Sequence, residues 1–366
     1  MRVEATPAGW SGGPVVADVP AVAVLEVSGA VLEWTVDDPA GAAATRMTVT
    51  DVAAADWLWR VLGRAGHAAV VAGADVADVD VRADALEPLR RLAVGYWLRR
   101  WWPESSRDGI VGLDRSLLDG ELALLVSEAQ EFFTDDTLDS DVEGLLAPHR
   151  LALAALEGGG DPRVLDVVRA CVELADDTGV WAADLPAAPS AAVAGRREDY
   201  ALAAGVGADR SGTAIATGVA SVDWVAVPPR TFDAAEHTVE WSVAVSDTAT
   251  ADASVLATMR VALLDGASAG GIAVRLRAGS VGAAGVLDAD GTVALPLVGE
   301  RDDAITELQA WDHGWSTATV SVGADRPVTV EAAALRQRVR DVARARLARP
   351  GPDAFLAEIL AAESDY

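Results

Sequence analysis

Two pairs of neighbouring acidic and histidine residues have the side chains that acid–base or metal chemistry needs. Glu236–His237 and Asp312–His313 both lie at the borders of segments whose alternation predicts strands. If these borders meet in the fold, two imidazoles and two carboxylates would form a general-base or zinc site. No histidine pair has the His-x-x-x-His spacing of a metal-binding helix, and polar side chains at strand ends more often solvate a loop. We therefore expect no metal.

Ser268 is the candidate nucleophile. It lies in the string Gly266-Ala267-Ser268-Ala269-Gly270, and Asp312 and His313 follow it in the chain order of a catalytic triad. A nucleophile elbow leads from a strand into a helix, whereas a strand pattern over 272–276 follows here. We therefore favour a small-residue loop at this position. The alternative is a hydrolase, metal-assisted or Ser-based, whose site uses His237, His313, Asp312, Glu236 and Ser268.

Aromatic and basic side chains are concentrated in the segment 96–103. It contains Trp97, Arg99, Arg100, Trp101 and Trp102 within two predicted helical turns. Tryptophan and arginine are enriched at the energetic centres of protein interfaces. A helix buries one stripe, and these side chains cover more than one. Two interpretations follow: the cluster wedges between helices and the N-terminal sheet, or it contacts a partner protein.

A basic helix is predicted near the end of the sequence, over 331–349, and Arg340 and Arg344 belong to it. Pro350-Gly351-Pro352 ends that helix, and a short amphipathic helix with Phe355 and Ile359 follows. On an acidic chain, a basic helix pairs most simply with its own body. The other interpretation is a docking element that lies in a partner's groove.

The hydrophobic pattern of the segments that must position these residues changes along the chain. Residues 1–20 contain several glycines and prolines and are expected to be a loose leader. Strands around a Ser28-Gly29 turn, then helices, predict an α+β and helical domain over 21–180. A Pro- and Ala-rich linker is expected over 181–198, and a helical tail over 331–366.

Alternation with period two dominates 199–330 and predicts an antiparallel β-sandwich. Val239, Trp241 and Val243 face one way, and the segment 272–276 alternates in the same manner, with Arg275 and Arg277 on its polar side. Asp290-Gly291 predicts a hairpin between two further strands. The fold class is therefore α+β multidomain: an N-terminal α+β/helical domain, an antiparallel β-sandwich and a C-terminal helical tail.

Composition excludes several kinds of chemistry. The 366 residues include no lysine and no asparagine, so P-loop, kinase, PLP and Schiff-base sites are excluded, as is N-glycosylation. No Gly-x-Gly-x-x-Gly follows a strand in a βαβ setting, and we expect no cofactor.

The net charge of −27 argues against nucleic acid as a partner. The single cysteine, Cys171, allows no intrachain disulfide and fits a reducing compartment. We found neither a signal-peptide pattern nor an apolar run of membrane-spanning length, and expect a cytoplasmic protein.

These observations favour a non-enzymatic interaction or adaptor protein, or a subunit of a complex, with a protein partner. Two observations support this hypothesis. No set of candidate catalytic residues lies in the sequence context that its chemistry requires. A β-sandwich, a Trp/Arg cluster and a helical tail are present. The hydrolase stays the second hypothesis. A ligand-binding β-sandwich module for a sugar or peptide is the third.

Overall fold

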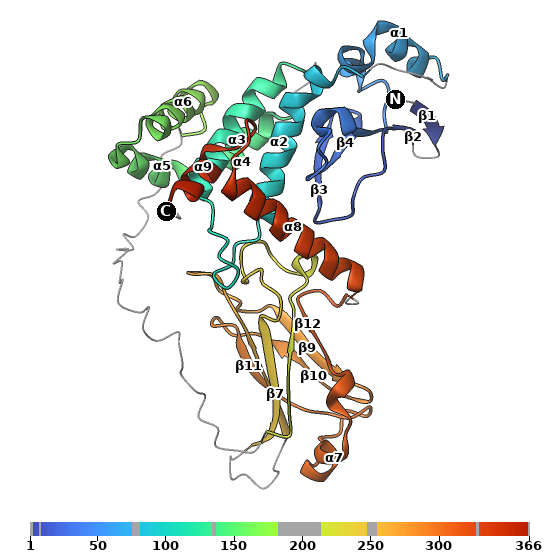
Figure 1. Cartoon of the computed structure of the whole chain (residues 1–366), viewed down its shortest axis with the longest axis vertical. Helices are drawn as coiled ribbons and strands as arrows, with labels where there is room; N and C mark the ends of the chain where they lie inside the picture. Colours follow the sequence, from blue (N-terminus) through green and yellow to red (C-terminus); the bar gives the residue numbers. More distant parts are fainter. Residues whose placement is uncertain are drawn as a thin grey trace. The chain divides into compact units, whose positions relative to one another are not determined.

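The computed structural model describes residues 3–6, 9–74, 81–133, 137–181, 214–246, 255–326 and 329–364. They form helices and three antiparallel sheets, a mixed α+β architecture (Figure 1). The chain divides into two compact units. Unit 1 comprises Met1–Ala183 and Thr329–Tyr366, and unit 2 comprises Asp184–Val328. Apart from Trp181, the linker expected over 181–198 lies outside the described residues.

The sheet of unit 1 has the strand order β1-β2-β5-β4-β3. Its strands are β1 (Val3–Thr6), β2 (Gly9–Gly12), β3 (Val22–Val27), β4 (Ala30–Thr35) and β5 (Arg46–Val49). The predicted turn at Ser28-Gly29 is confirmed, since Val27 pairs with Ala30 across it.

The first residues differ from the leader that we expected over 1–20, because β1 and β2 lie within that range and pair with each other. Gly9 had suggested a loop, but it belongs to β2. Its φ is +121°, and a Cβ atom there would lie 2.0 Å from the carbonyl oxygen of Val49. The glycine therefore permits a close strand approach that no other residue allows.

Helices make up the rest of unit 1. They are α1 (Trp59–Val71), α2 (Ala83–Trp101), α3 (Arg115–Gln130), α4 (Asp139–Leu146), α5 (Arg150–Leu156), α6 (Pro162–Thr178), α8 (Val330–Ala348) and α9 (Leu356–Ser364). Short 3-10 turns are η1 (Gly41–Ala44), η2 (Asp56–Leu58), η3 (Ala147–His149) and η4 (Glu157–Gly159). Asp114 caps α3 by accepting from the Leu117 N–H, and α2 packs against β3.

The predicted C-terminal helices are present, but they are part of unit 1 (red in Figure 1). Glu121 of α3 accepts hydrogen bonds from the N–H groups of Leu356 and Ala357, at 2.7 and 3.4 Å. These are the first N–H groups of α9, which lack partners inside their own helix. A carboxylate 235 residues away in sequence thus caps the last helix.

Unit 2 contains a four-stranded sheet of order β11-β8-β7-β6 and a three-stranded sheet of order β10-β9-β12. Its elements are β6 (Ala216–Ala220), η6 (Trp224–Ala226), β7 (Val239–Val245), β8 (Val255–Val261), β9 (Ala273–Ala278), β10 (Val281–Val286), β11 (Thr292–Pro296), α7 (Glu307–Asp312), η7 (Trp315–Thr317) and β12 (Thr319–Val322).

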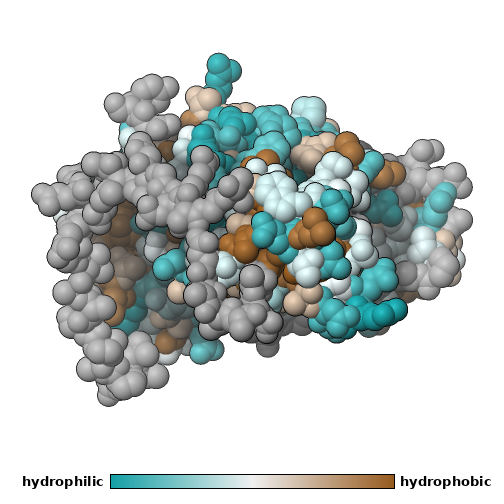
Figure 2. Space-filling model, turned by 90° about the horizontal axis from the view of Figure 1, so that it is seen from below, coloured by the Kyte–Doolittle hydropathy of each residue, from teal (hydrophilic) through white to brown (hydrophobic). Residues whose placement is uncertain are grey.

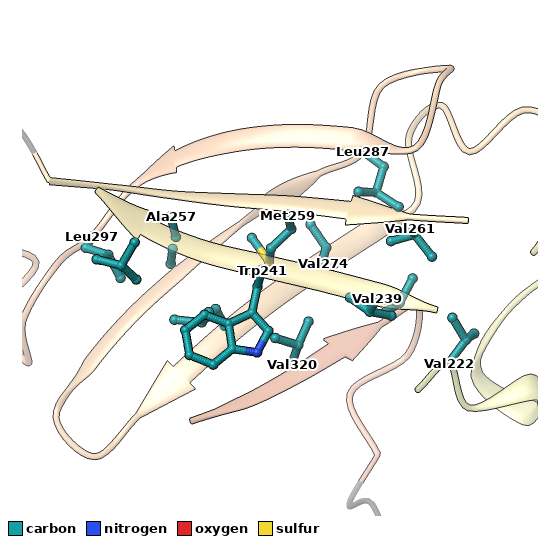
Figure 3. Packing of buried hydrophobic residues seen from close by; sticks show 14 of the residues in the cluster. Val222, Val239, Trp241, Ala257, Met259, Val261, Val274, Leu287, Leu297 and Val320 are labelled. Atoms are coloured by element: carbon teal, nitrogen blue, oxygen red, sulfur yellow. The ribbon is translucent and has the colours of Figure 1, made fainter. Parts of the chain in front are cut away.

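Both sheets of unit 2 contribute to one hydrophobic core. Val239, Trp241 and Met259 come from the four-stranded sheet, and Val274 and Val320 come from the three-stranded sheet. Figure 3 shows these side chains gathered between the strands. The alternation read from the sequence is confirmed here, since Val239 and Val243 are fully buried.

The prediction of a hairpin at Asp290-Gly291 is wrong, because the strands before and after the turn pair with other strands. The turn exists, with Asp288 accepting from the N–H groups of Asp290 and Thr292. However, β10 before the turn pairs with β9, and β11 after it pairs with β8. The same turn chemistry therefore joins two strands that lie in different sheets.

Across the described ranges, no helix is both long enough and apolar enough to cross a membrane.

Candidate interaction surface

The tryptophans of the Trp/Arg cluster are largely internal. Trp97 and Trp102 are 3% and 6% exposed. Their indole N–H groups donate to the carbonyl oxygens of Pro20 and Val111, at 2.7 and 2.8 Å. A buried indole that has its hydrogen bond inside the chain offers nothing to a partner. The sequence offered two interpretations of the cluster. Trp97 and Trp102 fit the one in which the cluster packs between elements of its own chain.

The arginines of the cluster also have intramolecular neighbours. Arg99 donates from Nε to Asp119 Oδ1 at 2.9 Å. Arg100 lies over the ring of Trp101, with its guanidinium carbon 4.2 Å from the centroid. Trp101 is half-buried, and it is the tryptophan of this cluster that reaches the surface. The cluster therefore serves mainly to join α2 to the rest of unit 1.

Asp119 of α3 is the centre of this polar network. Its side chain is fully buried and accepts from His149 Nε2 at 2.8 Å and Arg115 Nε at 3.5 Å, besides Arg99. Burial acts to raise the pKa of Asp119, but the hydrogen bond from His149 and the charges of Arg99 and Arg115 outweigh it. The net pKa is below its ordinary value, so the carboxylate is held ionised and paired.

The residues proposed for a docking tail contact unit 1 instead. Arg340 is buried and lies 3.4 Å from Asp108, which also pairs with Arg344 at 3.3 Å. Phe355 is fully buried, and Ile359 is half-buried. The basic helix pairs with acidic groups of its own unit, and Arg340 and Phe355 are not available as a partner surface.

The five residues of the hydrolase hypothesis have different environments. His313 Nε2 lies 2.9 Å from the carbonyl oxygen of Ala278. The side chain of His237 is exposed, and its backbone N–H donates to Ser221. Glu236 is half-buried, and Asp312 is the exposed last residue of α7.

Ser268 is exposed, and its hydroxyl accepts from the N–H of Gly270 at 3.4 Å. The chain continues from there into β9 rather than into a helix, as we expected for a loop. Among the described residues, no three His, Cys, Asp or Glu side chains gather as metal ligands would. Burial raises the pKa of the Cys171 thiol to about 12, so this thiol is poorly reactive.

Helix α7 carries an exposed apolar pair that the sequence analysis did not single out. Leu308 and Trp311 are 71% and 48% exposed. At a spacing of three residues they lie on one side of the helix, and we call this pair the α7 face. Figure 2 views the molecule from the end at which Figure 1 draws α7, and hydrophobic residues there lie in small patches among polar ones.

Local sequence explains why so short a helix is rigid. Thr306 caps it in a complete capping box: its hydroxyl accepts from the Gln309 N–H, and Gln309 Oε1 accepts from the Thr306 N–H at 2.8 Å. The N–H groups of Thr306 and Gln309 are thereby satisfied. The pattern Thr306-x-x-Gln309 was the signal in the sequence that predicts this helix start.

The opposite side of α7 is anchored in the core of unit 2. Ala310 is fully buried, and its carbonyl oxygen accepts from the Trp315 indole N–H at 2.9 Å. Trp315 lies edge-on to His313 and near Trp241, with ring centroids 4.9 and 6.5 Å apart. His313, considered above as a catalytic residue, thus packs against Trp315, and Trp315 anchors α7 to the core of unit 2.

Trp311 differs from Trp59, the other strongly exposed tryptophan of the described chain. Arg60 and Arg64 lie 5.3 and 6.0 Å from the Trp59 ring centroid. The Trp311 indole N–H donates to Glu307 at 3.3 Å, which restrains the ring from one edge only. The side chain of Trp311 is 48% exposed and is therefore available for contact.

Comparison with known proteins identified no relative: no protein-family model, no curated protein and no solved structure matches the chain.

Proposed function

We propose that the chain is a non-enzymatic interaction or adaptor protein of the cytoplasm, and that its β-rich unit is a β-sandwich module that binds a partner protein through the α7 face. The observation that carries the proposal is a tryptophan and a leucine, both strongly exposed, on one face of a capped helix anchored in a core. Tryptophan is the residue most enriched at interface hot spots.

Rigidity is the second support. Burying a mobile side chain at an interface costs conformational entropy, about 0.5–1.5 kcal/mol for each immobilised chain. Here the capping box and the Trp315 hydrogen bond hold α7 before any partner arrives. The face is therefore preorganised, and less of the binding energy is lost on ordering it.

The remainder of the chain fits this role. Unit 1 joins its first 183 residues to the C-terminal helices through buried polar contacts, such as Glu121 with the α9 backbone. It would act as the body that carries the module. His313 and Ser268 bond to different backbone groups, and among the described residues no three His, Cys, Asp or Glu side chains gather as metal ligands would, so no geometric observation favours a hydrolase.

Co-purification tests the proposal. A tagged chain is expressed in its natural cell, and its stoichiometric partners are quantified for the wild type and for the double variant Leu308→Ala/Trp311→Ala. The matched control is Leu151→Ala/Trp59→Ala, which removes the same side-chain types from exposed positions of unit 1. We expect the first variant to lose its partner and the control to keep it. Equal partner recovery by both variants would refute the proposal.

A further inference from the structure

The three-stranded sheet of unit 2 has a polar face that gathers positive charge. Arg275 and Arg277 on β9 pair in register with Ser321 and Thr319 on β12. Residues directly opposite each other in an antiparallel pair, and alternate residues of one strand, share a face. Two guanidinium groups and two hydroxyl groups therefore project from the same side of β9 and β12, which lie next to each other in Figure 1.

The opposite side of the same strands is the core. Val274, Leu276 and Val320 are almost fully buried, and Figure 3 shows Val274 and Val320 near Trp241. The core fixes the register, because a shift by one residue would place the arginines inside. The polar face is consequently held by the packing of the sheet rather than by a flexible loop.

A pocket of about 420 Å³ opens over this face. It is lined by Arg275, Arg277, Thr319, Val320, Ser321, Asp325 and Arg326. On the other side of β9, the positions opposite the two arginines are Gly282 and Ala284 of β10. Neither of these two positions carries a side chain longer than a methyl group, and the pocket is open to a small ligand.

The charges in the pocket are incompletely paired. Arg275 pairs with Asp325, and Arg326 lies 3.4 Å from Asp223 outside the pocket. Arg277 has no ion-pair partner among the residues that the structure describes. In a chain of net charge −27, this is a local excess of positive charge.

Donor number and charge decide which anion fits. Three guanidinium groups and the Ser321 hydroxyl supply more donors than the two oxygens of a carboxylate accept, whereas the Thr319 hydroxyl donates to the carbonyl oxygen of Arg277 at 3.4 Å. A phosphate has more acceptor oxygens and up to twice the charge, and arginine forks match its geometry. We propose that this pocket binds a phosphate group, with Arg277 as its main ligand and Arg275 released from Asp325 to join it.

The site is separate from the α7 face, and its test is independent of the function proposed above. Inorganic phosphate is titrated into the full-length chain at low ionic strength by calorimetry. We expect saturable binding of one phosphate, weakened about tenfold or more by Arg277→Ala, because a hydrogen-bonded ionic contact is lost. Arg301→Ala removes the same charge from an exposed turn of unit 2 and should leave the affinity unchanged.

Asp325→Ala is expected to change the affinity for phosphate in the opposite direction. It removes the carboxylate that competes for Arg275, so phosphate should bind severalfold more tightly. Failure of the wild type to saturate, or equal affinity of the wild type and Arg277→Ala, would overturn the proposal.

Further probes identify the source of the phosphate. Tighter binding of O-phosphoserine than of inorganic phosphate would point to a phosphorylated protein side chain as the ligand. Equal or weaker binding would point to free phosphate or a small phosphate compound. Malonate supplies two carboxylates at the same charge, and binding of malonate as tight as that of phosphate would contradict a phosphate site.

Discussion

At the scale of single residues, Asp119 shows how a network that resembles a reactive site works as a structural one. A buried carboxylate beside a histidine and two arginines has the composition of a catalytic group. Its partners come from α2, from the preceding turn of α3 and from η3. The contacts therefore join three elements of unit 1.

Removal of this carboxylate should destabilise unit 1. Asp119→Ala removes the buried carboxylate that Arg99, Arg115 and His149 share, and breaking a buried ion pair typically costs about 3–5 kcal/mol. Arg99 and Arg115 reach solvent, with side chains 32% and 42% exposed, which reduces the expected loss to about 2–3 kcal/mol. Urea unfolding measures it. Asp166→Ala, at an exposed pair with Arg169, should change stability by less than about 0.5 kcal/mol.

The contribution of Asp119 should also depend on pH. Its pKa in the folded chain is below the ordinary value, so folding favours the ionised form. The stabilisation is fully present above the unfolded-state pKa of about 3.9 and is lost as the pH falls through the folded-state pKa. The stability difference between wild type and Asp119→Ala should thus shrink as the pH falls below about 4. A difference that stays constant at pH 3 would contradict this assignment.

At the scale of elements, alternation and turn signals were predictable, whereas pairing between distant segments was not. The buried positions of β7 and β9 and the turn at Ser28-Gly29 follow from local pattern. The turn at Asp290-Gly291 was also visible, but which strands it joins depends on partners elsewhere in the chain. Local sequence specifies a turn and leaves its sheet undetermined.

The environment of the candidate site residues likewise depends on contacts that local sequence does not specify. The composition of 96–103 is equally suited to a core and to an interface, and burial decides between them. Likewise, the C-terminal helices were predicted from periodicity, but nothing local indicated that Glu121 would cap α9. The α7 face was missed for a different reason: six residues are too few to show a helical period.

The docking of α9 gives a prediction at this scale. Phe355 is fully buried, with its ring under the guanidinium of Arg91 and close to Gly95. Phe355→Ala should destabilise unit 1 by about 3–5 kcal/mol through loss of buried area and the cavity that remains. Val330→Ala on α8, at an exposed position, should have an effect of less than about 0.5 kcal/mol. Denaturant unfolding of both variants provides the comparison, and equal effects would show that α9 is not part of the core.

At the scale of the whole molecule, each unit has its own core. Unit 1 combines segments from both ends of the chain, and the core of unit 2 consists of residues between Val222 and Val322. Cores that share no residues are expected to unfold separately.

Calorimetry should accordingly show two unfolding transitions. Phe355→Ala should lower the temperature of one transition, and Met259→Ala, at a fully buried position of β8, should lower that of the other. A single transition that both substitutions shift equally would mean that the two units unfold as one.

The most direct test of the proposed function is contact at Trp311 itself. A photoreactive phenylalanine derivative placed at position 311 and, as a control, at position 151 is activated in living cells that express each full-length chain. We expect a discrete cross-linked partner at position 311 that is absent at position 151. No adduct at position 311, or the same adducts at both positions, would contradict it.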